Sequence, residues 1–351
     1  MVCAMLTVDV AMPFALFLVT LASLLLSKRV EGKLKSTFEE REFRARYVVL
    51  LVVMIGVAVS IVAFIPQIAL IALFMFSYSS LLFTFSYFFS VLSKKRTLLL
   101  ISTFLVASLV VGVVALLGPF VGVSVFYGGL AAFGLAVFAF GASLLELKKG
   151  RLSGKWYLAV LPPALFVIVF FVFRSTPLWF PFLFDAFGVV FAILITLYLS
   201  SLFTWKTTFI FAGFLTVMDF VLVLVTQVTE PAATQLTGLG LPVIIVLPII
   251  PPIFNSAALW GLQQIGLGLG DFFFAGTLAT QTYKKYGKKI ALISAVTMTF
   301  SFAVFESLLL STESGAFPGT VMIIVGWLPV VAWKLLVERK NKSKVIVGEK
   351  V

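Results

Sequence analysis

Long apolar blocks dominate the chain, each running for about 18 to 27 residues without a Lys or Arg. A helix of about 20 apolar residues spans the ~30 Å hydrocarbon core of a bilayer. Hydrophobic residues make up 62% of the chain and charged residues 11%, whereas soluble domains are about half apolar and about a quarter charged. A soluble fold of this composition would expose large apolar patches. The sequence therefore predicts an all-α polytopic membrane protein.

The apolar pattern predicts about eleven membrane-spanning helices. Pro66-Gln67 and Gly118-Pro119 divide two stretches that are too long for one crossing, because both pairs favour turns. The expected spans are 5–27, 47–64, 68–92, 98–118, 121–147, 157–174, 179–203, 207–229, 257–283, 288–311 and 316–337.

Basic residues follow the expected spans in a regular alternation. With eleven spans, every one of the 26 Lys and Arg residues except Arg174 falls on the same side of the membrane. The positive-inside rule then places the N-terminus outside and the C-terminus in the cytoplasm of a cell-membrane protein. The net charge of +12 therefore orients the chain in the lipid bilayer, and no basic, aromatic-laced domain indicates a nucleic-acid partner.

Residues that the chain lacks exclude several chemistries. It has no His and a single Cys, Cys3. Ser-His-Asp and Cys-His catalysis, an intramolecular disulfide and a Cys- or His-ligated metal site are excluded. We expect no metal and no cofactor. A hydrolase built from this chain must use carboxylates or a Ser–Lys pair.

Two aspartates lie inside expected spans, where an ionisable group is costly unless it serves a function. Asp219 is roughly 15 Å from the external end of span 207–229, and Asp271 is roughly 16–21 Å from the external start of span 257–283. The two spans are consecutive and antiparallel, so we expect the two acids to face each other. Two close carboxyl groups share one proton, so that one activates a water and the other hydrogen-bonds to a scissile carbonyl.

Other acids near expected helix ends have simpler interpretations. We expect Asp9 to be solvated near an outer end, and Glu146 to be solvated at a cytoplasmic end. Asp185 is interpreted as a helix-start cap or a surface acid. Glu306 is expected to reach the membrane surface or to hydrogen-bond a neighbouring helix.

Three glycines precede the second aspartate at alternate positions, Gly266, Gly268 and Gly270. Each destabilises a helix by about 1 kcal/mol relative to Ala, and each lets another backbone approach closely. The alternative is that these glycines only pack neighbouring helices.

The segment Gly268-Leu269-Gly270-Asp271 resembles the GxGD motif of the presenilin and signal-peptide-peptidase family of intramembrane aspartyl proteases. Asp219 matches the family's other catalytic aspartate, with Met218 where the family usually has Tyr. Pro318 and Gly319 stand where the family has Pro-Ala-Leu-Pro, and only the first proline of that motif is kept. The resemblance covers about 179–337, and the family typically has nine helices, so about two N-terminal helices would be additional.

The resemblance implies that three parts of the chain have different roles. Residues 1–178 would be a scaffold on the substrate side, residues 179–337 the catalytic core, and residues 338–351 a basic cytoplasmic tail. Asp219 and Asp271 would be catalytic, with Gly266, Gly268, Leu269, Gly270, Pro318 and Gly319 positioning the substrate.

The loop between the two Asp helices, 230–256, is expected outside the cell, as in signal peptide peptidases. The resemblance then implies that type II transmembrane segments or remnant signal peptides are the substrates, and that no partner subunit is obligatory. The β-branched stretch in this loop is either a short strand or a re-entrant segment, and either pairs with an unwound substrate or caps the helix ends. Its candidate pairing residues are Leu241, Pro242, Val243, Ile244, Ile245 and Val246.

Two other classes of function stay open. A proton-coupled transporter would use embedded carboxylates to carry protons, but no internal repeat typical of transporters is evident. The reduced proline motif also fits a protease-like scaffold without catalytic activity.

Overall fold

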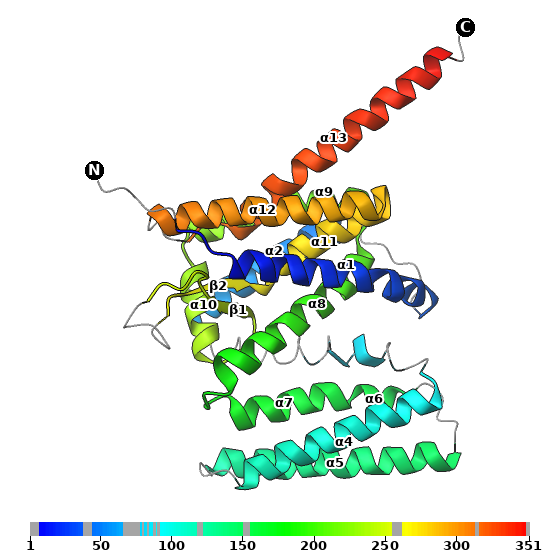
Figure 1. The fold of residues 1–351 in the computed structure, drawn as a ribbon, viewed down its shortest axis with the longest axis vertical. Coiled ribbons are helices and arrows are strands. Elements are labelled where there is room, and N and C mark those ends of the chain that lie inside the picture. Colours follow the sequence, from blue (N-terminus) through cyan, green and yellow to red (C-terminus); the bar gives the residue numbers. More distant parts are fainter. Residues whose placement is uncertain are drawn as a thin grey trace. The chain divides into compact units, whose positions relative to one another are not determined.

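A computed structural model describes most of the chain, and it is largely helical (Figure 1). The described residues are 7–37, 44–65, 92–117, 122–149, 155–254, 262–312 and 316–348, with single residues and short runs between 78 and 89. Within this part, seven helices are long and apolar enough to cross a membrane, and helices at Ala11–Ser27 and Tyr157–Phe173 are shorter but apolar. The chain therefore has the architecture of an α-helical, multi-pass membrane protein.

The number of spans is not settled by these helices. Most of the expected span 68–92, and both expected turns at Pro66-Gln67 and Gly118-Pro119, lie outside the described residues. The count of about eleven stays a prediction.

Contacts divide the chain into two compact units, one of residues 70–186 and one of residues 1–69 with 187–351. The first two helices thus belong with the unit that contains both Asp219 and Asp271. The functional division at residues 178 and 337 is not tested by these contacts and stays a prediction.

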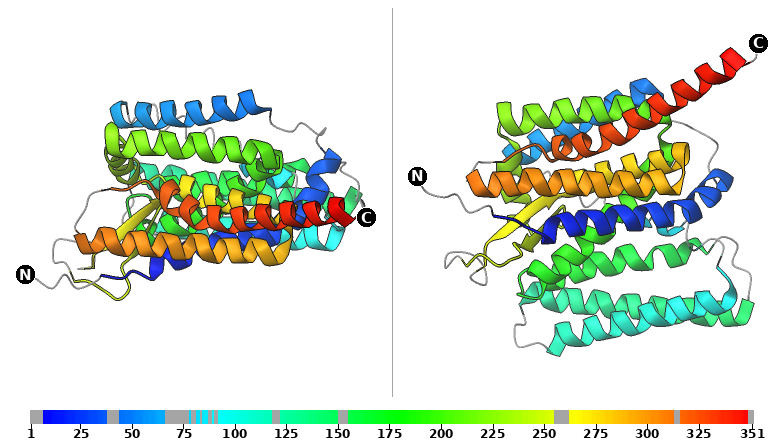
Figure 2. Two further views of the ribbon diagram at one scale, coloured as in Figure 1. Left: turned by 90° about the horizontal axis from the view of Figure 1, so that it is seen from above. Right: turned by 45° about the horizontal axis from the view of Figure 1, so that its top comes forward.

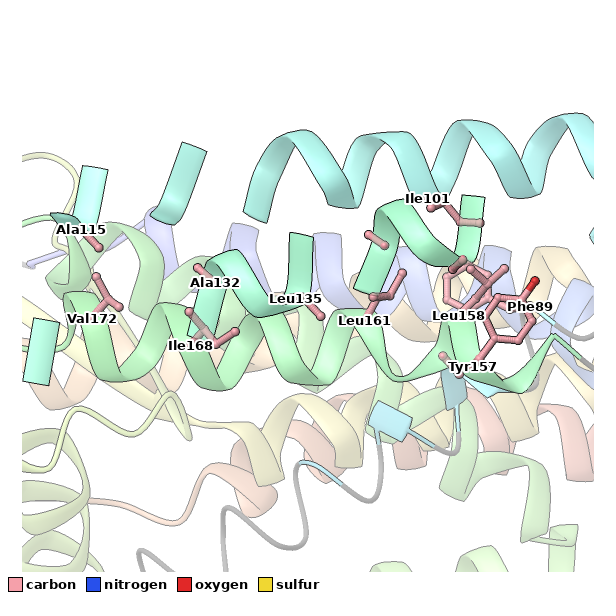
Figure 3. Close-up of a cluster of buried hydrophobic side chains, with 13 residues drawn as sticks. Phe89, Ile101, Ala115, Ala132, Leu135, Tyr157, Leu158, Leu161, Ile168 and Val172 are labelled. Atoms are coloured by element: carbon pink, nitrogen blue, oxygen red, sulfur yellow. The ribbon is translucent and has the colours of Figure 1, made fainter. Parts of the chain in front are cut away.

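The unit of residues 70–186 has its own apolar core (Figure 3). It contains α4 (Lys94–Leu117), α5 (Val123–Lys149), α6 (Trp156–Ala159), α7 (Leu161–Phe173) and the π-helical turn η1 (Trp179–Leu183). Small residues bring these helices together, since a Cβ on Gly128 would lie 2.2 Å from Val172 Cγ2. Glu146 is buried here and accepts a 2.5 Å hydrogen bond from the Tyr157 hydroxyl. The expectation that Glu146 is solvated was wrong.

The other unit surrounds one central helix, α11 (Leu269–Tyr286), which has twelve buried residues. Helices α1 (Ala11–Thr37), α9 (Trp205–Phe220), α12 (Lys288–Thr312) and α13 (Gly319–Gly348) all contact α11, and α2 (Ala45–Phe64) lies along α9 (Figure 2). The remaining elements of this unit are most of α8 (Phe184–Leu202), η2 (Val221–Val225), α10 (Thr229–Gly238), β1 (Ile244–Pro248) and β2 (Gln264–Gly268).

Strands β1 and β2 form an antiparallel hairpin directly before α11. Ile244 pairs with Gly268 and Pro248 with Gln264, and the Leu269 N–H extends the ladder by donating to the Val243 carbonyl. β-branched residues favour β1, whereas Gly266 and Gly268 weaken any helix at β2. The expected span 257–283 was therefore wrong in the described part before Leu269, because residues 264–268 form β2 and α11 begins only at Leu269.

Local signals fix the ends of the two Asp helices. A reciprocal capping box between Thr204 and Thr207 starts α9. Gly287, with φ +83°, ends α11 in a conformation that side chains disfavour. Helix α10 was not predicted from the sequence, which indicated only a loop from residue 230 to 256.

Aromatic contacts connect α9, α11 and α13. Phe211 of α9 lies 5.5 Å from Phe273 and 6.0 Å from Phe274 of α11, measured between ring centroids. Trp327 of α13 packs 5.2 Å from Phe209 and donates a 2.9 Å hydrogen bond to Thr282. Rotation of any one of these helices would break such contacts, so the helices that carry the site are fixed relative to one another.

Candidate active site

Asp219 lies near the end of α9, six residues before η2 finishes. Six residues correspond to about 9 Å of helix, so Asp219 is nearer the end of its helix than the ~15 Å expected from sequence. Its Oδ2 accepts two hydrogen bonds from Thr320 of α13, from the hydroxyl at 2.6 Å and from the backbone N–H at 3.2 Å. Both donors come from the first turn of α13, where unpaired N–H groups favour an anion.

Asp271 is the third residue of α11 and follows the hairpin directly. The expected depth of roughly 16–21 Å along its helix was wrong, because the preceding residues form β2. The carboxyl group packs on Gly319, where a Cβ would lie 2.6 Å from Oδ1 and 2.7 Å from Cγ. Such distances are too short for a real Cβ, so only glycine fits at position 319 with the carboxyl group in this place.

The two carboxyl groups meet at one peptide unit of α13. Gly319 contacts Asp271 and the next residue, Thr320, binds Asp219. Bond lengths limit the separation of the nearest carboxyl oxygens to at most about 10 Å. The two groups also interact electrostatically. Both aspartates are partly buried.

The start of α13 is held in place from several sides. The Pro318 carbonyl accepts from the N–H groups of Val321 and Met322, which begins the helix. The ring of Phe317 stacks on Phe305 of α12, with centroids 5.7 Å apart. Further along, a Cβ on Gly326 would lie 2.3 Å from the Thr297 carbonyl oxygen, so α13 and α12 are in close backbone contact. These contacts position Gly319 and Thr320 between the two aspartates.

The remaining residues of the sequence-predicted site occupy the hairpin and its junction with α11. Gly266 and Gly268 are in β2, and Leu269 and Gly270 begin α11. Of the candidate pairing residues, Ile244, Ile245 and Val246 are in β1, while Leu241, Pro242 and Val243 precede it. The stretch therefore contains a short strand, Ile244–Pro248, which was one of the two expectations. Its role in substrate pairing stays a prediction.

An apolar groove of about 510 Å³ runs between α2 and the segment from α9 to η2, and Met218, the residue before Asp219, lines it. Met218 of α9 and Leu222 of η2 line one side of the groove. Gly56 is in close contact with Met218, because a Cβ there would lie 2.3 Å from the Met218 sulfur. The lining residues on α2 and just after it are Val53, Gly56, Val57, Ser60, Ile61, Phe64 and Ile65.

Two other acids differ from expectation. Asp9 is 1% exposed and caps α1, so the prediction of a solvated carboxylate was wrong. Glu306 is also 1% exposed and has no hydrogen-bond partner in the part of the chain that the structure describes. Asp185 is in the first turn of α8, as a helix-start acid would be. Among the described residues, no group of three or more Cys, Asp or Glu residues could hold a metal ion.

Thr320 is the site residue that sequence reasoning missed. It stands directly after Gly319, so the signal was its position at the head of the last helix. The chain matches no protein-family model and no curated protein. The functional assignment therefore depends on the geometry of this site and on the motifs described above.

Proposed function

We propose that the chain is an intramembrane aspartyl endopeptidase that uses Asp219, Asp271 and a water molecule to hydrolyse peptide bonds in transmembrane segments. The observation that carries this proposal is that consecutive residues, Gly319 and Thr320, contact the two carboxyl groups. Two acids on different helices thereby share one location in a bundle of membrane-length helices. The presenilin and signal-peptide-peptidase resemblance of the Gly268–Asp271 segment supports the same assignment.

The contacts of the two acids suggest different roles for them. Thr320 gives Asp219 two donors, which favour the carboxylate form of Asp219. Asp219 would then take a proton from the water as the water oxygen attacks the scissile carbonyl carbon. Asp271 would carry the shared proton and donate it to the carbonyl oxygen. Collapse of the tetrahedral diol breaks the C–N bond, returns a proton to the leaving nitrogen and releases a carboxylate and an amine.

The hairpin offers a place for an opened substrate. A helix must unwind before its peptide bonds can be cut, and an unwound strand needs backbone partners. The two described strands pair only with each other, so each has an outer edge that no other described strand occupies. Strand β2 leads through Leu269 and Gly270 to Asp271, which places such an edge beside the acid pair.

The groove between α2 and α9 is our proposed docking site for the substrate helix before it unwinds, because it is apolar and is lined by Met218, the residue before Asp219. Replacing Val57 with Trp should fill it, since Val57 lines the groove and is 47% exposed. We expect KM for a transmembrane peptide to rise roughly tenfold, with little change in kcat.

Met54→Trp is the matched control for this variant. Met54 is also on α2 and is 59% exposed, but it does not line the groove. Steady-state cleavage of a fluorogenic transmembrane peptide in detergent micelles gives both constants. Equal KM values for the two Trp variants would show that the groove does not bind the substrate.

Thr320→Val should slow cleavage by roughly tenfold, because it removes the hydroxyl donor to Asp219 and keeps the backbone N–H donor. Thr320→Ser keeps a hydroxyl and is expected to restore most of the rate. Single-turnover kinetics on the same peptide make the comparison. A Val variant as fast as the Ser variant would mean that the hydroxyl contact has no catalytic role.

The proposed orientation and substrates follow from charge and resemblance. The N-terminus would be outside, the C-terminus cytoplasmic, and the substrates type II segments or remnant signal peptides. Purified chain mixed with such a peptide tests the function. Cleavage that needs both aspartates supports it, proton-linked solute uptake would favour a transporter, and a folded chain that does neither would indicate an inactive scaffold.

A further inference from the structure

A second acidic pair lies outside the proposed active site, between α12 and the start of α1. Glu306 of α12 is 1% exposed, and neither of its side-chain oxygens has a hydrogen-bond partner among the described residues. A buried carboxylate without donors or a counter-charge is strongly unfavourable. Since no described residue offsets a charge on Glu306, a ligand that neutralises it would stabilise this position.

Asp9 is the neighbouring acid, and it accepts three hydrogen bonds from backbone N–H groups. Its carboxyl oxygens accept from the backbone N–H groups of Ala11 and Met12, both at 3.0 Å, and of Ile250 at 2.8 Å. These N–H donors compensate negative charge on the Asp9 side chain. Asp9 also interacts electrostatically with Glu306. A charged Glu306 would therefore face a second negative charge.

No basic side chain that the structure describes lies near this pair, and the basic residues of α1 begin only at Lys28, about 25 Å of helix from Ala11. On α12, Lys288 and Lys289 lie at the opposite end, more than about 25 Å of helix away. On α11, Asp271 has Asp219 as its electrostatic partner, and Lys284 and Lys285 are in the last turn. On α13, the described charged side chains (Lys334, Glu338, Arg339 and Lys340) lie far from its start. The segment around Ile250 carries no charged residue from 231 to 254.

The ligand that fits this site best is a proton. A calcium ion needs six to eight oxygen ligands and a magnesium ion needs six. Asp9 is committed to three N–H donors, which leaves Glu306 as the free carboxyl group. A proton needs only that one carboxyl group and removes the charge.

We propose that Glu306 is a proton-binding site inside the helix bundle, and that its bound proton keeps the start of α1 and the segment after β1 attached to α12. The proposal does not depend on the protease assignment. Three hydrogen bonds donated by backbone N–H groups connect these parts: Thr7 N–H to the Ser311 hydroxyl of α12, Val10 N–H to the Ile250 carbonyl, and Ile250 N–H to the Asp9 carboxyl group. Loss of the proton would place two negative charges beside these links and open them.

Infrared spectroscopy of the full chain in lipid nanodiscs tests the protonation directly. Two proteins are compared, one with Asp271→Asn alone and one with Asp271→Asn and Glu306→Gln, so that Asp271 contributes to neither spectrum. At neutral pH we expect a carboxylic-acid C=O band in the first protein that is missing in the second. The band should fade as the pH is raised. Its absence from this difference spectrum would overturn the proposal.

Amide hydrogen exchange tests the mechanical consequence in the same samples. At alkaline pH, peptides containing residues 9–12 and 250 should exchange roughly tenfold faster in the parent than in Glu306→Gln at the same pH. Glu230→Gln, at an exposed acid on α10, is the matched control and should behave like the parent. Equal exchange in the parent and Glu306→Gln would contradict the proposal.

Asp9→Asn provides a second variant in case Glu306→Gln does not fold. Asn also caps helices, so α1 should persist. Without the neighbouring negative charge, the Glu306 band is expected to disappear at a lower pH than in the parent. An unchanged or higher pH would mean that Asp9 does not influence Glu306, and the proposed site would be wrong.

Discussion

Replacing either Asp219 or Asp271 with Asn is expected to lower the rate of transmembrane-peptide cleavage by about 10²- to 10⁴-fold, the usual range for loss of general acid–base catalysis. Asn has nearly the shape of Asp but neither accepts a proton from water nor shares one with a second carboxyl group. The two acids act as one unit, so the double variant should lose little more activity than each single variant. Initial rates on a labelled peptide give the three values.

A correct fold must be shown for these variants. Thermal unfolding of each should stay within a few degrees of the parent, because Asn has nearly the shape of Asp. Glu230→Gln neutralises an exposed acid of α10 and should leave the rate unchanged. A folded single Asn variant that keeps a third of the parent rate would contradict the paired role of the acids.

Adding a single methyl group at position 319 is expected to have the second largest effect. In Gly319→Ala the new Cβ would meet Asp271 at 2.6 Å from Oδ1, 2.7 Å from Cγ and 3.0 Å from Oδ2. The carboxyl group or the start of α13 must therefore shift by roughly 1 Å. A misplacement of this size costs about 10²-fold in rate. We expect that loss in kcat, with the peptide still bound.

Gly213→Ala is the matched control for this substitution. Gly213 lies on α9, six residues before Asp219, and nothing lies within 4 Å of a Cβ built there. An Ala at this helical position should stabilise the fold by up to about 1 kcal/mol and leave cleavage intact. If Gly319→Ala and Gly213→Ala had equal kcat values, the contact between Gly319 and Asp271 would have no catalytic role.

The class of fold was predictable from the sequence, because apolar blocks of membrane length need only local information. The structure contains seven helices of that kind among the described residues. The pairing of the two Asp helices was also foreseen, and Phe211 of α9 does pack on Phe273 and Phe274 of α11. That pairing depends on the order of helices along the chain, which the sequence contains directly.

The start of α11 was misjudged because hydropathy does not distinguish a buried helix from a buried strand. The sequence predicts that the glycines before Asp271 loosen a helix, whereas Gly266 and Gly268 are part of β2. The decisive partner, β1, lies about 20 residues upstream, and strand pairing across such a separation is a tertiary property.

The partners of individual carboxyl groups were the least predictable feature. Asp9 was expected to be solvated, but it binds the backbone of Ile250, 241 residues away in sequence. Thr320 binds Asp219 across 101 residues. Neither contact leaves a periodic or compositional signal. A single sequence could therefore identify the acidic residues but not the residues that hydrogen-bond to them.

Mass spectrometry of cleavage products formed in H₂¹⁸O tests the central proposal most directly. The purified chain in nanodiscs would be incubated with a synthetic transmembrane peptide, beside the variant that lacks both Asp219 and Asp271. Two fragments that result from a cut within the apolar segment, with one ¹⁸O in the new carboxyl group and no product from the double variant, are the predicted result. Equal cleavage by the double variant, or intact peptide with every helical substrate given to a well-folded parent, would contradict it.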